Sequence, residues 1–376
     1  MIGRARCVLG AALAPLILLA CSAPEHPQPH PHAHPAPRRA GDPGGRATET
    51  ANVPCGTALS SLRPGAGTTL ALSRNCTYRG TLTIVADDVT VTAWGTGSLP
   101  VLLLGSDGAT VDLYGSHDTV GNLSLVGVAP RTWDCGGTRT PAGHVDGVDI
   151  HPGATGDTVT GITATGFYAA VYIMAGASGN TVRDSTLRDN TELDRNGASG
   201  SAGAFGVLLW GNGNKVMGND ITGNQACSLA YGTDGSAVEV YGGSGNVIVS
   251  NRASGDSAFT ELGSYRGHVA SGNSYTGNSV SDGATELGMT FLITRGSGGP
   301  YGPVYDTTAT GNTVHLTNPG DRGVISAGWR PGDGTLLTLA RNYLDLGTRP
   351  VLYEDGGYVD GAGNTFIGTC TPPSAC

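Results

Sequence analysis

The chain has 376 residues, with 21 Lys and Arg against 30 Asp and Glu and a formal net charge of -9. This acidic balance excludes a nucleic-acid-binding surface, because neutralising phosphates requires clustered basic side chains. Gly accounts for 62 residues and charged side chains for only 14%, which indicates a turn-rich fold with a buried core rather than a disordered chain.

The first 20 residues have the pattern of a secretory signal. Two Arg precede an apolar run over 8–20, which is too short to span a bilayer. The run ends Leu18-Leu-Ala-Cys21, which resembles the bacterial lipobox, and this resemblance implies cleavage before Cys21 and a lipid on its thiol. We therefore expect a protein held on the outer side of the cell membrane by lipid alone. Because Leu is less usual at position 19, a plain secretory signal is the alternative.

Residues 21–50 are expected to form a tether. The segment is rich in Pro and carries His at 26, 30, 32 and 34, and Pro favours an extended chain that lacks backbone donors. The alternating His also suit Zn²⁺ or Cu²⁺, although a solvated spacer requires no ion. The remaining residues, 51–376, are expected to form the folded domain.

Cysteine usage agrees with export. Of eight Cys, Cys7 leaves with the signal and Cys21 is lipidated, so six remain. An even number in an exported chain predicts disulfides. Proximity and loop placement favour Cys55–Cys76, Cys135–Cys227 and Cys370–Cys376 among the possible pairings.

A short phrase that contains Gly-Asn recurs through the body of the chain, with its Asn at 180, 214, 246, 273, 312 and 364. A constant phrase at variable spacing predicts one structural unit with loop insertions. Gly-Asn suits a turn that needs a left-handed residue, and the alternating runs at 147–150 and 171–173 suit short strands.

The chain repeats a pattern of strand, Gly-Asn turn, strand and loop over roughly residues 80–368. This pattern resembles the right-handed parallel β-helix of the pectate lyase and polygalacturonase superfamily. The resemblance implies an all-β, single-stranded solenoid with stacked inward side chains and Asn ladders along its axis. A solenoid needs covered ends, so we expect the segment 55–78 with its disulfide to cap the N-terminal end and 368–376 to close the other. We expect a monomer.

Aligning the units on the glycine before each turn predicts two outward columns of side chains. If Val148, Ile150 and their counterparts point inward, their neighbours point outward. One column is Asp149, Tyr172, Leu208 and Glu239, and the next is His151, Met174, Trp210 and Tyr241. Rings beside carboxylates suit a sugar, so we expect an extended polysaccharide to bind along this face.

The segment 146–152 partly resembles two motifs. Gly147, Asp149 and His151 match the Tyr-Gly-Phe-Asp-Pro-His motif of mannuronan C5-epimerases, which has Tyr and Pro where this chain has Asp146 and Ile150. Asp146, Gly147 and Asp149 also match the Asn-Thr-Asp-Gly-x-Asp of polygalacturonases, whose later motifs are absent here. The simpler alternative is that Asp146 and His144 serve turn geometry or cap a loop.

Removing the C5 proton of a uronate requires a base, an acid and a group that neutralises the sugar carboxylate. His151 as base, Tyr172 as proton donor and Asp149 as orienting or neutralising partner meet this requirement, with an Arg nearby. The residues expected to bind the substrate around them are Asp146, Trp210, Tyr241, Arg252 and Arg266.

The phrase Thr-Glu-Leu-Gly occurs twice, 25 residues apart, and carries Glu261 and Glu286. If 25 residues make one unit, the two Glu lie on neighbouring strands about 5 Å apart. This separation suits the carboxyl pair of a retaining glycosidase, or a Ca²⁺ site completed by carbonyls. The third alternative is that a one-residue shift between the two strands turns one Glu away from the other.

Two classes of function remain open. The first is an enzyme that cleaves or epimerises a polysaccharide without a cofactor, or with Ca²⁺. Because a net charge of -9 opposes a polyanionic substrate, hydrolysis of a neutral glycan by Glu239, Glu261 and Glu286 is the close alternative to a lyase or epimerase. The second class is a non-catalytic envelope protein that binds glycan or is a passive solenoid.

Overall fold

The computed structural model describes residues 49–104, 108–127, 145–191, 203–228, 232–282, 288–295, 301–327, 337–354 and 358–371. The expected signal, Cys21 and the tether lie outside this range, and so do Cys135, Glu286 and Cys376, so these expectations stay predictions. Among the described residues, no helix has the length and apolar character needed to cross a membrane.

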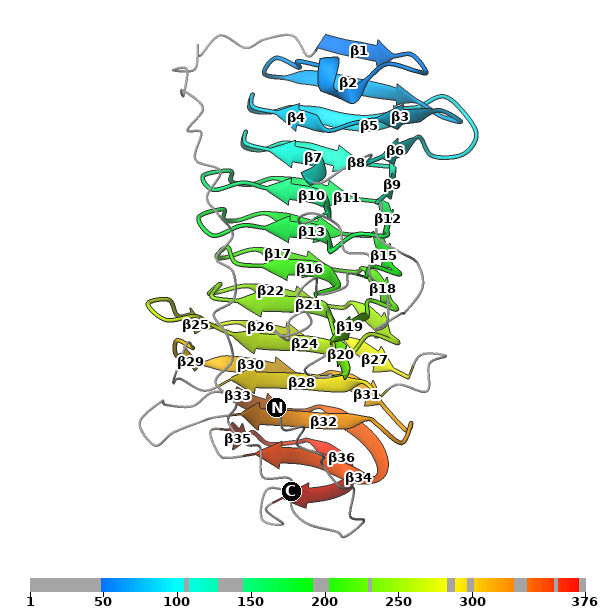
Figure 1. Ribbon diagram of the computed structural model, residues 1–376. Coiled ribbons are helices and arrows are strands. Elements are labelled where there is room, and N and C mark those ends of the chain that lie inside the picture. The colour runs from blue at the N-terminus through cyan, green and yellow to red at the C-terminus, as the bar shows by residue number, and fades with distance from the viewer. Residues whose placement is uncertain are drawn as a thin grey trace, which may run out of the picture.

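The described chain winds into stacked coils, and along the chain it visits three rows of parallel strands in turn (Figure 1). Row 1 consists of β1 (Glu49–Val53), β2 (Thr68–Ser73), β5 (Thr90–Trp94), β8 (Thr119–Gly121), β11 (Thr158–Thr160), β14 (Thr181–Arg183), β17 (Lys215–Met217), β22 (Val247–Val249), β26 (Ser274–Thr276), β30 (Thr307–Thr310), β33 (Leu337–Ala340) and β35 (Tyr358–Asp360). Row 2 consists of β3 (Thr77–Arg79), β6 (Val101–Leu103), β9 (Ser124–Val126), β12 (Thr163–Thr165), β15 (Thr186–Arg188), β18 (Asp220–Thr222), β23 (Arg252–Ser254), β27 (Ser279–Ser281) and β31 (Thr313–His315).

Row 3 carries the longer strands and the candidate site. It consists of β4 (Leu82–Ile84), β7 (Gly108–Leu113), β10 (Val145–Ile150), β13 (Ala169–Ile173), β16 (Phe205–Leu209), β21 (Ser236–Tyr241), β24 (Ala258–Gly263), β28 (Thr290–Arg295) and β32 (Arg322–Ala327). The long β34 (Tyr343–Glu354) continues both row 2 and row 3, and β36 (Thr365–Thr371) pairs with it.

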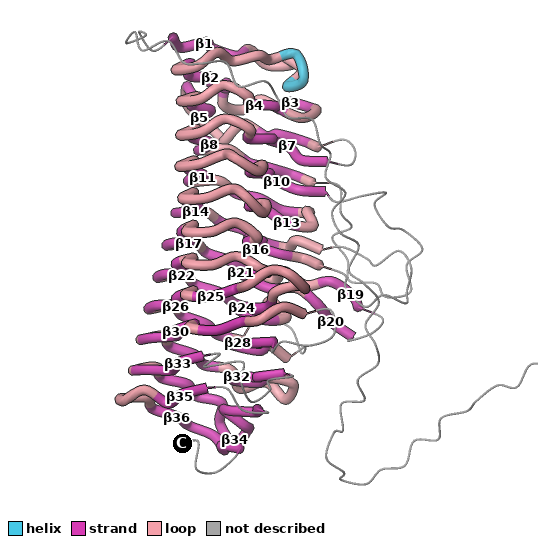
Figure 2. Tube along the Cα trace, turned by 90° about the vertical axis from the view of Figure 1, so that its left-hand side faces the viewer, coloured by secondary structure: helices cyan, strands magenta, loops and turns pink. Residues whose placement is uncertain are grey.

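A few elements lie outside the rows. The 3-10 helix η1 (Leu59–Ser61) lies at the β1 end of the stack (Figure 2). The antiparallel hairpin of β19 (Ala226–Ser228) and β20 (Gly232–Asp234) precedes β21, and the short β25 (Ala270–Ser271) and β29 (Val304–Tyr305) pair with each other.

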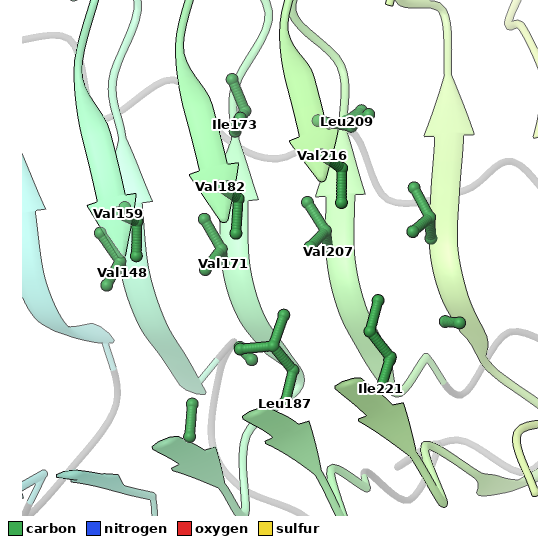
Figure 3. Close-up of a cluster of buried hydrophobic side chains, with 14 of the residues drawn as sticks. Val148, Val159, Val171, Ile173, Val182, Leu187, Val207, Leu209, Val216 and Ile221 are labelled. Carbon is green, nitrogen blue, oxygen red and sulfur yellow. The ribbon is translucent and has the colours of Figure 1, made fainter. Parts of the chain in front are cut away.

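Aliphatic side chains from all three rows meet along the axis. Val148, Val171 and Val207 stand in register on neighbouring strands of row 3 and are fully buried. Figure 3 shows them beside the stacked side chains of rows 1 and 2. Because a fully buried aliphatic side chain contributes about 1.5 to 3 kcal/mol, these repeated columns supply the main stabilisation of the coil.

Polar side chains inside the turns form three ladders parallel to the axis. In each ladder, the backbone N–H of one rung donates to a side-chain oxygen one coil later. The rungs of the first ladder are Asp118, Asp157, Asn180, Asn214, Asn246 and Asn273. Those of the second are Ser185, Asn219, Asn251, Asn278, Asn312, Asn342 and Asn364. Those of the third are Asn190, Asn224 and Asp256.

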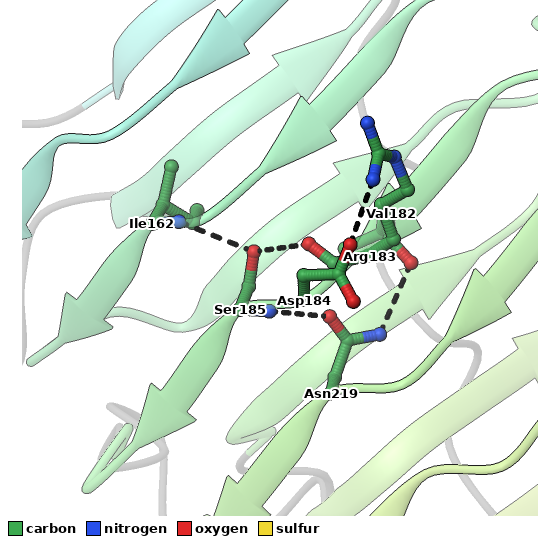
Figure 4. A network of polar contacts seen from close by, with 6 residues as sticks. All are labelled: Ile162, Val182, Arg183, Asp184, Ser185 and Asn219. Carbon is green, nitrogen blue, oxygen red and sulfur yellow. Dashed lines mark hydrogen bonds and ion pairs between the residues drawn. The ribbon is translucent and has the colours of Figure 1, made fainter.

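Figure 4 shows the start of the second ladder. The Ser185 hydroxyl accepts from the Ile162 N–H at 3.2 Å, and the Ser185 N–H donates to Asn219 Oδ1 at 3.1 Å. In the first ladder Gly213, at a φ of 64°, precedes Asn214, so the glycine of the Gly-Asn turn supplies the left-handed residue. The predicted Asn ladders are therefore confirmed.

The six Gly-Asn phrases do not all belong to one ladder. Asn273 is the last rung of the first ladder, whereas Asn312 belongs to the second. The phrase is used at two different turns of the coil, because both turns need a left-handed residue followed by an amide that bridges to the next coil.

The N-terminal disulfide is also as predicted. Cys55 and Cys76 are bonded, with a Cα–Cα distance of 5.3 Å across 21 residues. The other two pairings each include a residue outside the described range and stay predictions. The chain is thus an all-β, right-handed, single-stranded parallel β-helix with a disulfide at its N-terminal end, as its repeats indicated.

Candidate functional site

The strands of row 3 bend so that two residues three positions apart both face outward. In β13, Ala169 and Tyr172 pack on the outer face, whereas Ala170 and Val171 between them lie in the core. In β10 the inward pair begins with Gly147, where an added Cβ would lie 2.3 Å from the Ala170 carbonyl oxygen of the next coil. Only glycine permits that close approach. The pairing of β10 with β13 keeps one register before and after Gly147, with Asp146 opposite Ala169 and Val148 opposite Val171.

This bend brings two carboxyl groups of one strand together. Asp146 and Asp149 are both buried on the outer face of β10, and their carboxyl groups are hydrogen-bonded to each other. Asp146 Oδ1 also accepts from the Ala169 N–H at 3.1 Å. Asp149 Oδ1 is buried and has no hydrogen-bond partner among the described residues.

A histidine and a third carboxylate complete the cluster. Asp112 lies on β7 in register with Asp149, and its Oδ1 is 2.9 Å from Nε2 of His151, which directly follows β10. The Tyr114 ring stacks on the His151 imidazole with centroids 3.8 Å apart. One ligand-type atom from each of Asp112, Asp149 and His151 lies within 4.8 Å of the other two. We call these three residues the acidic triad.

Burial and mutual repulsion set the protonation of this cluster. Burial, together with the charge of Asp112, raises the pKa of Asp146 to about 7. Burial and the charges of Asp146 and Asp112 raise the pKa of Asp149 well above its ordinary value. Burial and the charges of Asp146 and Asp149 also raise the pKa of Tyr172, so its phenol keeps its proton.

Aromatic rings continue from the cluster toward the C-terminal end of row 3. Trp210 lies 6.2 Å from Tyr172 and 5.2 Å from Tyr265, measured between ring centroids. Tyr265 stacks with Tyr241 at 5.9 Å and contacts His268 at 3.8 Å. These five side chains form what we call the aromatic column, which borders the acidic triad through Tyr172.

The predicted outward column on row 3 is in register. Asp149 pairs with Tyr172, Tyr172 with Leu208, and Leu208 with Glu239, so Asp149 and Glu239 stand three strand steps apart as expected. The next residue in this column is Glu261, opposite Glu239 on β24. Glu239 Oε2 accepts from the Ser236 hydroxyl at 2.9 Å.

Two expectations about the site were wrong. In the strand after β24, the residue in register with Glu261 is Ile293, so the assumed unit of 25 residues does not hold here. Glu286 itself lies outside the described residues, and its position stays a prediction. The unit is longer here than the assumed 25 residues, because Ala258 pairs with Thr290. The second error concerns one of the expected substrate-binding residues.

Arg252 lies on β23 in row 2, opposite Asp220 and Ser279, rather than beside the acidic triad. Arg266 is exposed in the loop that carries Tyr265 and His268, at the far end of the aromatic column. The chemistry-bearing part of the face, among the described residues, is therefore rich in carboxyl groups and aromatic rings.

Sequence reasoning missed Asp112, Tyr114, Tyr265 and His268. A signal for the first two was present, because Asp112-Leu-Tyr114 repeats the spacing of Asp149-Ile-His151 one coil earlier. Tyr265 and His268 lie in a loop after β24, where no repeat phase indicates which way a side chain points.

Comparison with solved structures gives neighbours of the same architecture. An alginate lyase from Paenibacillus sp. str. FPU-7 superposes with a TM-score of 0.53 at 15% identity, over 83% of this chain and 99% of that one. The tailspike protein of E. coli bacteriophage HK620, solved in complex with a pentasaccharide, gives a TM-score of 0.58 at 11% identity. That match covers 84% of this chain and 60% of the tailspike.

No protein-family profile matches the chain, and no curated protein matches it in sequence. At 11% and 15% identity, the two structural neighbours establish the parallel β-helix fold and nothing finer.

Proposed function

We propose that the chain is a carbohydrate-active enzyme that transfers protons at a glycan bound along row 3. Lyase or epimerase chemistry on a uronate sugar is the reaction that this geometry supports best. The observation that carries the proposal is the 2.9 Å contact between His151 and Asp112, which orients the imidazole beside Asp149. Tyr172 stands next to Asp149 in register on β13.

Each chemical task of that reaction has a candidate residue. When His151 Nε2–H donates to Asp112, the Nδ1 lone pair is free to accept the C5 proton. Tyr172 keeps its phenolic proton and so serves as the acid. Asp149, with its raised pKa, donates a hydrogen bond to the sugar carboxylate when it is protonated, and this bond takes the role that an Arg or Lys could otherwise have.

The remainder of the face suits a polymer. The aromatic column gives the sugar rings surfaces to stack on, and a solenoid face is long enough for several units. The structural neighbours include an alginate lyase and a tailspike bound to a pentasaccharide, which agrees with a glycan substrate. Export and anchoring through Cys21 remain the proposed location of this activity.

Hydrolysis of a neutral glycan is the second candidate. Glu239 and Glu261 lie opposite each other on neighbouring strands, which places their backbones about 4.8 Å apart. Carboxyl groups about 5 to 5.5 Å apart are typical of retaining glycosidases. A neutral substrate also avoids repulsion by the carboxyl groups of the acidic triad.

The test is a set of single variants assayed on acidic and neutral glycans in the presence of a chelator. Unsaturated product is read by absorbance, epimerised product by NMR, and hydrolysis by new reducing ends. We expect His151→Ala and Tyr172→Phe each to lower turnover by roughly 10²-fold or more, the usual share of a positioned acid or base. Glu261→Gln is the control and should keep near-normal turnover, and circular dichroism should show that all three fold.

The opposite pattern, with Glu261→Gln inactive and His151→Ala nearly normal alongside new reducing ends, would establish hydrolysis instead. Glycan binding by the unmodified protein without any product on the whole panel would favour the non-catalytic class.

A further inference from the structure

The acidic triad has the composition and spacing of a metal site. We propose that Asp112, Asp149 and His151 bind one divalent transition-metal ion of the zinc type. The proposal rests on the geometry of these side chains and is independent of the reaction proposed above, although it uses the same imidazole.

The distances fit coordination. Ligand bonds of about 2.1 Å place two neighbouring ligand atoms about 3.0 Å apart at octahedral angles and about 3.4 Å apart at the tetrahedral angle of zinc. His151 Nε2 and Asp112 Oδ1 are 2.9 Å apart, and the three ligand atoms of the triad lie within 4.8 Å of one another. Small rotations of the carboxyl groups therefore bring all three onto one ion, and its remaining positions stay open to water or sugar hydroxyls.

A second observation, the burial of an unpartnered carboxylate oxygen, also favours a bound cation. Asp149 is only 7% exposed, and its Oδ1 has no hydrogen-bond partner in the described part of the chain. Leaving such an acceptor buried and unpaired is costly, and a cation removes that cost. Among the described residues, the ion pair within the triad is that of His151 with Asp112. No described Lys or Arg forms an ion pair with any of the three residues.

The ligand types select the class of ion. Ca²⁺ and Mg²⁺ prefer sets of oxygen ligands, whereas an imidazole with two carboxylates suits Zn²⁺ and its first-row neighbours. Neighbouring side chains also fix the orientation of the ligands. Tyr114 stacks on the His151 ring, and the Asp146 carboxyl group is hydrogen-bonded to Asp149. Such supporting contacts are typical of metal sites.

The ion and the proposed base role exclude each other. A bound ion takes the place of the proton between His151 Nε2 and Asp112, and the neutral imidazole then carries its remaining proton on Nδ1. Nδ1 then has no lone pair with which to accept a proton from sugar. The metal-bound form is therefore expected to be the inactive one.

Metal binding is measured by Co²⁺ absorption titration and by equilibrium dialysis with Zn²⁺, both on the full chain after chelator treatment. The background is a chain in which His26, His30, His32 and His34 are all replaced by Ser, so that the N-terminal segment contributes no imidazole. We expect one Co²⁺ per chain. Loss of a side chain that only supports a metal ligand typically lowers metal affinity by roughly 10- to 100-fold. His151→Gln and Asp149→Asn each remove a ligand itself, so each should lower the affinity for Co²⁺ by more than this.

The matched control is His315→Gln. His315 forms the same type of pair with Asp345, at 3.1 Å, but belongs to no described group of three ligands, so this variant should bind Co²⁺ normally. Asp112→Asn, at a more exposed ligand, is the second variant if His151→Gln does not fold.

An absence of bound Co²⁺ in the His-to-Ser background, or equal affinity in the His151→Gln variant, would overturn the metal site. Inhibition by Zn²⁺ that a chelator reverses supports it. Activation by Zn²⁺ would also support the site, but it would overturn the role of His151 as base, so the two proposals fail separately.

Discussion

The ladders inside the turns and the acidic triad on row 3 both bury polar side chains, often in the same coils, yet they differ in how those groups are satisfied. Asn246 Oδ1 accepts two hydrogen bonds and its amide donates two. Asp149 Oδ1 accepts none among the described residues. The Asn rungs therefore stabilise the coil, whereas the triad is an electrostatic cost, and such costs are characteristic of functional sites.

The largest expected effect comes from breaking a ladder. Asn251 accepts from the backbone N–H and the amide of Asn219, and donates to Asn278 and to the Val216 carbonyl. Asn251→Ala leaves these buried groups unpaired, each at a cost of about 1 to 3 kcal/mol, so we expect it to lower the free energy of unfolding by about 3 kcal/mol or more. Urea denaturation measures this loss.

Asn364→Ala is the control for position. Asn364 is the last rung of the same ladder and is only partly buried, so its loss should cost clearly less. Equal losses at both rungs would mean that burial does not set the value of a rung.

A smaller effect of opposite sign is expected where the ladder contains a carboxyl group. Asp118 occupies a rung, its Oδ1 accepts from the Val89 N–H, and its Oδ2 has no partner among the described residues. Burial, with a contribution from Asp157, raises the pKa of Asp118 to about 8. In the unfolded chain the pKa is about 3.9.

The folded state therefore holds a proton that the unfolded state releases between these two values, and stability falls as the pH rises from about 4 to 8. Asp118→Asn supplies a permanent donor, so we expect a gain at pH 8 of about 1 kcal/mol or more, the net value of a hydrogen bond, and little gain at pH 4. Thermal unfolding across this pH range tests the prediction.

Asp184→Asn at the surface should show no such pH-dependent gain, because an exposed ion pair contributes little. A gain from Asp118→Asn of the same size at both pH values would contradict the buried-proton explanation.

The smallest expected effect lies in the aromatic column. Trp210 contacts Tyr241 and Tyr265 on the outer face, where a loss costs the core little. If this column binds sugar, Trp210→Ala should raise KM by about 5- to 10-fold with kcat unchanged, since such ring contacts contribute about 0.5 to 1.5 kcal/mol. Trp94→Ala, exposed on row 1, should leave KM unchanged. A fall in kcat instead would place Trp210 beside the reacting sugar.

The sequence predicts what the repeat governs. Val148, Val171 and Val207 follow the alternation of inward side chains, and the Asn rungs follow the Gly-Asn turns, so the fold and the outward column were foreseeable. The failures come from insertions. The segment between Glu261 and β28 is longer than one assumed unit, so the residue in register with Glu261 is Ile293 rather than the one that the repeat predicted.

The site itself was only half predictable. His151 meets Asp112 across 39 residues, and that contact depends on the exact number of residues that the loop between two coils adds. The bend that turns both Asp146 and Asp149 outward depends on Gly147 approaching the next coil, which strict alternation does not reveal.

The ladders also give the coil a direction. Each rung N–H that has a following rung donates toward the later coil, as Asn214 does to Asn246 and Asn246 does to Asn273, so these dipoles point the same way along the axis. During synthesis from the N-terminus, each completed coil has backbone N–H groups whose acceptors belong to the coil that follows. Each new coil therefore supplies acceptors for the N–H groups of the coil before it, which favours addition of coils at the C-terminal end. A partly synthesised chain exposes unpaired donors at that end, where it can associate with other chains.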